Sequence, residues 1–140
     1  FSKNLSGIEK GNVVVFHATK ENDYVKRVIG TEGDNVEYKK DELYVNGKKV
    51  DEPYLDYNKK HKQYNYITGS FETKDINQVD EKNKIPKGKL LVLGDNREVS
   101  KDSRSFGLID EDQIVGKVSF SFWPLNEMKF GFNPDTDYGK

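Results

Sequence analysis

The stretch YVKRVIG, residues 24–30, has the pattern of a β-strand that carries two adjacent cations. Aromatic and β-branched residues dominate it and Gly30 ends it, which favours a strand over a helix. Side chains alternate between the two faces of a strand, so Lys26 and Arg27 must point in opposite directions. One of these two cations is therefore expected to point toward the interior side of the sheet.

The rest of the chain is rich in strand signals and poor in helix signals. Further strands are predicted at NVVVF (12–16), NVEYKK (35–40), ELYV (42–45), KKV (48–50), KLLVLG (89–94) and KVSFSFW (117–123). The dipeptide Asn46-Gly47 is a strong signal for a hairpin turn. The only helical turn that the pattern predicts lies near residues 110–114. We therefore predict a mainly β domain.

Residues 56–85 differ in amino-acid composition from the segments on either side. They are rich in Lys, Asn, Asp and Tyr and contain few aliphatic residues. A chain of 140 residues is long enough for one domain with a core of its own. We interpret residues 1–55 and 86–140 as the two parts of a β core, and residues 56–85 as a polar insertion.

Composition excludes several kinds of partner and site. The 23 basic and 24 acidic residues give a net charge of -1, so no basic excess is present to bind nucleic acid. The chain contains no cysteine, which excludes disulfides, thiolate metal sites and cysteine nucleophiles. Its two histidines, His17 and His61, are too few and too far apart to suggest a zinc site. No metal or other cofactor is expected.

Two interpretations of the paired cations remain open on pattern alone. In the first, the strand lies at a sheet edge, Lys26 extends its amine to water and Arg27 is solvated. In the second, neighbouring side chains shield Lys26 from water. Burial disfavours a charged ammonium, and a neutral amine can act as a general base.

The stretch GDNREVSKDSRSFG, residues 94–107, is dense in charge yet lies between apolar segments. It is either a solvated charged turn or a turn in which the charges hold each other in place. In the second case its serines could cap backbone amides or orient another side chain. The ion-pair network would then consist of Asp95, Arg97, Asp102 and Arg104.

Taken together, these segments resemble the successive sequence boxes of bacterial type I signal peptidases, most closely those of the Gram-positive, staphylococcal type. The matching segments are EKGNVVVF (9–16), YVKRVIGTEGD (24–34), GDNREVSKDSRSFG (94–107) and GLIDEDQIVGKV (107–118). The resemblance implies the antiparallel β-sheet fold of that family. It also implies a membrane-anchored Ser–Lys endopeptidase that removes signal peptides from exported preproteins. Signal peptides and the membrane surface would be its partners, at the outer face of the cytoplasmic membrane.

The resemblance assigns roles to three residues at the reaction centre. Lys26 matches the general base of the family, and Ser100 matches the serine that orients this base. Val25 matches a position that lines the pocket for the small residue before the cleavage site.

Four charged residues match positions that support the site. Arg27 matches the arginine next to the base, and Asp95 matches the aspartate that pairs with it. Asp102 and Arg104 match an acidic–basic pair that fixes the loop. The pairing makes physical sense, because a free carboxylate close to a base lysine would favour its charged form.

The nucleophile of the family lies in a Ser-Met-x-Pro box upstream of the segment like residues 9–16, and this sequence contains no such box. Ser2 and Ser6 lack its context, so neither is assigned as the nucleophile. We expect that the membrane anchor, which precedes the box in the family, is absent as well. The 140 residues alone are therefore expected not to hydrolyse peptides.

Two other functions are compatible with parts of the sequence. One is a non-catalytic homologue that binds peptides by adding them to a sheet edge. The presence of Lys26 and Ser100 favours the enzyme, because a binding module has no need of a shielded base. The other is a self-cleaving Ser–Lys regulator of the LexA type, which fits the polar insertion and the spacing of the boxes less well.

Overall fold

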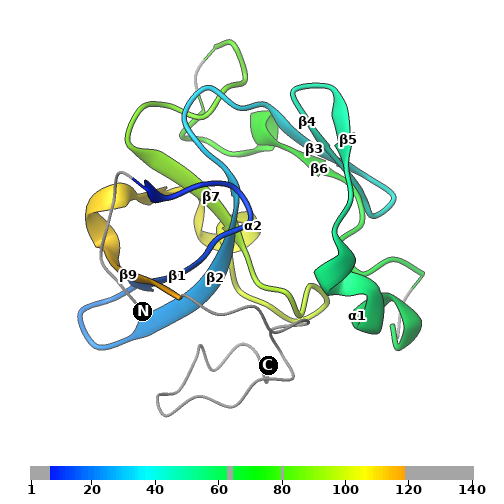
Figure 1. Ribbon diagram of the computed structural model, residues 1–140. Helices are drawn as coiled ribbons and strands as arrows, with labels where there is room; N and C mark the ends of the chain where they lie inside the picture. Colours follow the sequence, from blue (N-terminus) through cyan, green and yellow to red (C-terminus); the bar gives the residue numbers. More distant parts are fainter. Residues whose placement is uncertain (1–6, 63–64, 80, 119–140) are drawn as a thin grey trace.

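The computed structural model describes residues 7–62, 65–79 and 81–118, and within them the chain forms two antiparallel sheets (Figure 1). The larger sheet has five strands in the order β8-β7-β2-β1-β9. Their bounds are Val13–His17 for β1, Asp23–Gly30 for β2, Lys89–Leu93 for β7, Ile109–Asp110 for β8 and Ile114–Val118 for β9. The prediction of a mainly β, antiparallel fold is confirmed.

The smaller sheet has the order β5-β4-β3-β6 and lies beside the larger one (Figure 1). Its strands are β3 (Val36–Lys39), β4 (Glu42–Val45), β5 (Lys48–Val50) and β6 (Phe71–Glu72). The turn between β4 and β5 is formed by Asn46 and Gly47, which have φ values of 53° and 83°. Positive φ at both central residues is what a type I′ hairpin turn requires, so the predicted hairpin is confirmed.

Helical segments are short but more numerous than the sequence pattern predicts. The 3-10 turn η4 (Glu111–Gln113) lies where one was expected. The prediction that it would be the only one is wrong, because the chain also forms η2 (Pro53–Leu55), α1 (Asp56–Lys60), η3 (Thr73–Asp75) and α2 (Ser103–Phe106). Helices of one turn carry too little apolar periodicity to be recognised from sequence. Within the described part of the chain, no helix is long and apolar enough to cross a lipid bilayer.

One of the hydrophobic clusters of the core lies between the two sheets. Ile29 of β2 and Leu91 and Leu93 of β7 supply its side from the larger sheet. Tyr38 of β3 supplies part of the other side. Segment 56–85 also reaches this core, since it contributes Ile76, Ile85 and the strand β6 that pairs with β3. The division of the chain into a core and an insertion stays a prediction.

Strand β2 lies inside the larger sheet, between β1 and β7. Lys26 and Arg27 therefore point to opposite faces that are both covered, with exposed fractions of 0% and 2%. The interpretation of an edge strand with two solvated cations is wrong. The cause is β7, a strand far along the sequence that pairs with the side of β2 that β1 leaves open.

Strand β9 begins at Ile114, three residues before the predicted start of this strand at Lys117. It pairs with β1 through Val118, which lies opposite Val13. The remainder of the predicted strand, residues 119–123, lies outside the described residues.

Candidate active site

The centre of the candidate site is a contact between Lys26 and Ser100. The Nζ of Lys26 donates a hydrogen bond of 2.8 Å to the Oγ of Ser100, across 74 positions of sequence. Lys26 projects from the face of β2 that also carries Val28, a member of the apolar cluster with Val14 of β1. Its Nζ lies 5.4 Å from the centre of the Tyr24 ring. An amine inside the protein thus donates a hydrogen bond to a hydroxyl.

Gly94 makes this contact possible by leaving room for it. A Cβ placed on Gly94 would lie 1.9 Å from the Oγ of Ser100 and 3.3 Å from the Nζ of Lys26. A separation of 1.9 Å between two heavy atoms is far inside van der Waals contact. Only glycine at position 94 therefore lets the loop after β7 approach the amine, a requirement that the sequence interpretation missed. A glycine directly after a buried strand was the available signal.

Arg27 and Asp95 form a buried, two-pronged ion pair on the opposite face of β2. The Nε of Arg27 lies 2.9 Å from Oδ1 of Asp95, and its second terminal nitrogen lies 2.7 Å from Oδ2. Arg27 also donates to the carbonyl of Gly11 at 2.8 Å, and its guanidinium lies 4.1 Å from the centre of the Tyr54 ring. The structure thus brings together the pair that the resemblance implies.

Asp102 and Arg104 form the second pair. Arg104 donates to both carboxylate oxygens of Asp102, at 2.9 Å and 2.8 Å. The buried Asp102 also accepts from the backbone N–H of Gly94 at 3.0 Å, and from that of Arg104 at 3.1 Å, where it caps α2. The interpretation of residues 94–107 as a solvated charged turn is wrong, because Asp95, Arg97 and Asp102 are all buried.

Arg97 has a different carboxylate partner from the one expected. The sequence suggested a network within residues 94–107, whereas Arg97 pairs with Glu52, whose Oε2 lies 2.9 Å from it. Tyr38 and Tyr54 also donate to this Oε2, at 2.8 Å and 2.6 Å. No local pattern links Arg97 to a glutamate 45 positions away, so this cluster could not be found from sequence.

Burial raises the pKa of both phenols in this cluster above their usual value, and the nearby Glu52 adds to the effect while Arg97 opposes it. For Arg97, burial acts to lower the pKa, but the neighbouring Tyr38 and Glu52 outweigh it and the pKa is raised. The guanidinium therefore stays charged, and the two phenols keep the protons that they donate.

Val25 lies on the same face of β2 as Arg27, which is not the face of the Lys26–Ser100 contact. It precedes Lys26 in β2 and so points to the opposite face, where it packs with Val13, Val15 and Val118. Its side chain is fully buried there. A role in binding the residue before the cleavage site stays a prediction.

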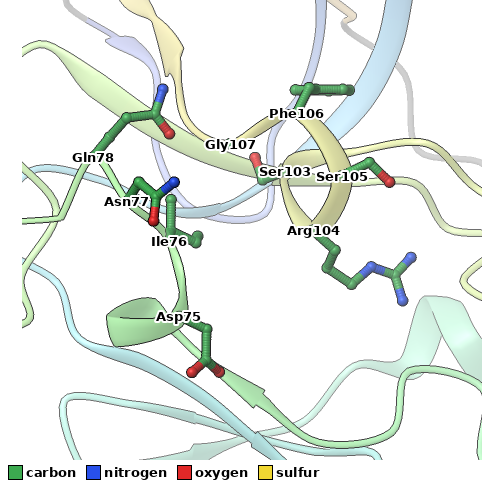
Figure 2. A pocket seen from close by; sticks show the side chains of 9 residues that line it. All are labelled: Asp75, Ile76, Asn77, Gln78, Ser103, Arg104, Ser105, Phe106 and Gly107. Atoms are coloured by element: carbon green, nitrogen blue, oxygen red, sulfur yellow. The ribbon is translucent and has the colours of Figure 1, made fainter.

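A pocket of about 390 Å³ lies on another side of the loop, between α2 and residues 75–78 (Figure 2). Arg104 lines it, whereas neither Lys26 nor Ser100 does. This pocket is therefore not the candidate active site. Among residues 7–62, 65–79 and 81–118, no group of three or more His, Asp or Glu side chains is placed to hold a metal ion.

Comparison with known proteins identifies the family to which the chain belongs. Residues 1–123 match the family described as "Signal peptidase, peptidase S26". Signal peptidase IB of Staphylococcus aureus (strain MRSA252) is 74% identical over 131 residues, which cover 93% of this chain and 69% of that protein. Signal peptidase I of Bacillus caldolyticus is 49% identical over 131 residues, covering 94% of this chain and 70% of that protein.

Among solved structures, the crystal structure of a signal peptidase I from Enterococcus faecalis V583 matches with a TM-score of 0.73 and 30% identity. The match covers 85% of this chain and 100% of that chain. The resemblance drawn from the sequence boxes is thus confirmed at the level of sequence and of fold. This chain belongs to the S26 family of signal peptidases, which are serine endopeptidases that remove signal peptides from preproteins.

Proposed function

We propose that Lys26 is the general base of a Ser–Lys dyad and that Ser100 orients its amine toward the attacking hydroxyl. The observation that carries the proposal is the 2.8 Å hydrogen bond between Lys26 Nζ and Ser100 Oγ, made by a lysine that is 0% exposed. A hydroxyl can fix the direction of an amine without adding a charge beside it.

The chemistry follows the general scheme of an activated serine. Lys26, in its neutral form, takes the proton of the nucleophilic serine as that Oγ attacks the scissile carbonyl carbon. The resulting ammonium gives the proton to the leaving amine as the peptide bond breaks. Water then releases the acyl group from the serine. We predict that the nucleophile belongs to a Ser-Met-x-Pro segment, so that the 140 residues alone are inactive.

The two ion pairs support this role of Lys26 electrostatically. A carboxylate close to the amine would favour its charged form and weaken it as a base. Arg27 engages both oxygens of Asp95, and Arg104 engages both oxygens of Asp102. Asp95 and Asp102 are thereby each neutralised by an arginine of their own.

We further propose that the enzyme works at the outer face of the cytoplasmic membrane and contacts the membrane surface. Val25 would line the pocket for the small residue before the cleavage site. A non-catalytic peptide-binding homologue is the alternative function. It predicts that substrate binding survives the loss of Lys26 and that no variant of the full-length protein cleaves.

Replacing Ser100 with alanine tests the proposed orientation of the base. We expect Ser100→Ala to lower kcat of the full-length enzyme on a preprotein by about 10- to 100-fold, because a misdirected base still retains part of its effect. Cleavage of a radiolabelled preprotein, followed over time, measures this. Ser105→Ala, which removes an exposed hydroxyl of α2, is the matched control and should cleave at the wild-type rate. Equal rates for both variants would contradict the role of Ser100.

A methyl group at position 94 should be as damaging as the loss of Ser100. In Gly94→Ala the new Cβ collides with Ser100 and crowds Lys26, so the hydrogen bond between them must break. We expect kcat to fall by about 100-fold, the loss typical of a shift of roughly 1 Å at a reaction centre. Gly33→Ala is the control, since its φ of +83° brings backbone strain but its Cβ meets nothing within 4 Å. Wild-type kcat in Gly94→Ala would show that the close approach is not needed.

A further inference from the structure

The cluster around Arg97 joins the smaller sheet to the loop of the candidate site. The Arg97 guanidinium donates to Oε2 of Glu52 at 2.9 Å and to the hydroxyl of Tyr38, which belongs to β3, at 3.0 Å. A third contact, 3.1 Å long, runs to the Oγ of Thr68. The Arg97 and Glu52 side chains are 0% and 2% exposed. An arginine of the active-site loop is thus held by side chains that lie outside that loop.

The same guanidinium fixes the backbone at Gly94. The Nε of Arg97 donates to the Gly94 carbonyl at 2.8 Å, while the Gly94 N–H donates to Asp102 at 3.0 Å. Hydrogen bonds therefore hold both the carbonyl and the N–H of Gly94. Because Gly94 lies in close contact with Ser100, a shift of this backbone must move the Lys26–Ser100 pair.

We propose that Tyr38 and Glu52 are positioning residues for this pair, acting through Arg97 on the Gly94 carbonyl. The inference rests on the proposed function of Lys26 and Ser100. It extends the candidate site beyond residues 24–27 and 94–104, to strand β3 and to the short segment between β5 and η2.

Two features make Tyr38 and Glu52 the sensitive members of the cluster. The Tyr38 hydroxyl donates to Glu52 Oε2 and accepts from Arg97, so it bridges the carboxylate and the guanidinium. Glu52 Oε2 accepts three hydrogen bonds, whereas Glu52 Oε1 is buried and has no hydrogen-bond partner among the described residues. The three hydrogen bonds of the carboxylate thus all go to Oε2, the oxygen that contacts Arg97.

The test is the rate of preprotein cleavage by full-length enzyme carrying Tyr38→Phe, which removes the bridging hydroxyl and keeps the ring. We expect kcat to fall by about 10-fold while KM stays within about twofold, because the change acts on geometry at the reaction centre and not on substrate contacts. Tyr44→Phe is the matched control on the neighbouring strand β4, where the ring lies near Lys39, and should keep wild-type kcat.

Glu52→Gln adds a second variant, which keeps the shape of the side chain and removes its charge. We expect a larger fall in kcat, and thermal unfolding of each variant is measured so that rates are compared on folded protein. If Glu52→Gln does not fold, Tyr38→Phe alone decides. A change in KM or in unfolding temperature with kcat unchanged would overturn the inference.

A double-mutant cycle with Arg97→Lys checks the route of the effect. Lysine cannot make the same set of forked contacts. Adding Tyr38→Phe to Arg97→Lys should therefore lower kcat little further than Arg97→Lys alone does. A full, additive effect would show that Tyr38 does not act through Arg97. Failure of the proposed function has a different signature, namely a Lys26→Met variant that still cleaves.

Discussion

Replacing Lys26 with methionine is expected to reduce kcat for signal-peptide cleavage by the full-length enzyme by about 10²- to 10⁴-fold, the usual contribution of a positioned general base. Methionine has a similar unbranched length and fills the buried space on the face of β2 that carries Val28. It offers no nitrogen to accept the proton of the attacking serine. The initial rate of preprotein cleavage under substrate saturation measures the effect.

Two further variants separate loss of the base from loss of structure. Lys26→Arg keeps a positive charge and hydrogen-bond donors, but arginine stays protonated and cannot accept a proton, so it should be as inactive as methionine. Lys39→Met replaces an exposed lysine of β3 and should cleave at the wild-type rate. Undiminished cleavage by Lys26→Met, with its fold intact, would defeat the Ser–Lys mechanism.

Much of the fold was accessible from sequence because strand signals are local. Runs of β-branched residues mark β1 and β2, an apolar run marks β7, and Asn46-Gly47 marks a turn whose geometry few other residues allow. The short helices were missed, although α2 carries a readable beginning and end. Asp102 caps its first turn, and Gly107 follows it with a φ of 85°. In a stretch dense with charged and polar residues, a capping aspartate and a final glycine do not stand out as the ends of a helix.

The environment of Lys26 and Arg27 could not be derived from the strand that carries them. Both the solvated and the buried interpretation were compatible with YVKRVIG, because pattern within one strand does not say whether the strand is central. The answer depends on β7, which pairs Leu93 with Arg27 and Val92 with Val28. What the sequence did provide was a resemblance that placed the two segments in one site.

The partner of Arg97 was even harder to predict from sequence than the environment of Lys26 and Arg27. Its charge suggested a partner, and the nearest acids in sequence, Asp95 and Asp102, were the natural choice. Each of these acids is already engaged by another arginine. Glu52 directly precedes Pro53 in a charged segment of the sequence, where a carboxylate is ordinary. Charge pairing in the interior is decided by which loops the fold brings together, and this information is not local.

Removal of Asp95 is expected to have the largest effect on stability. Asp95→Ala leaves the guanidinium of Arg27 buried without the carboxylate that binds it at two points. Breaking a buried ion pair by deleting one partner costs about 3–5 kcal/mol in the free energy of unfolding, because an uncompensated charge remains inside the protein. Chemical denaturation of wild type and variant measures this loss. Glu42→Ala, which breaks the exposed pair with Lys49, is the control and should leave the free energy of unfolding close to the wild-type value.

Asp95→Ala should also lower the rate of preprotein cleavage, for a reason separate from the loss of stability. Asp95 directly follows Gly94 in the chain, so its anchorage to Arg27 on β2 also ties down the backbone beside Ser100. A double variant, Arg27→Met with Asp95→Ala, distinguishes the two effects. It removes the stranded charge and should recover part of the lost stability relative to Asp95→Ala alone, since an apolar replacement of a buried pair is often tolerated. It does not restore the tie between β2 and the loop, so its kcat should remain low. Wild-type cleavage by the double variant would mean that Asp95 supports the fold without positioning the base.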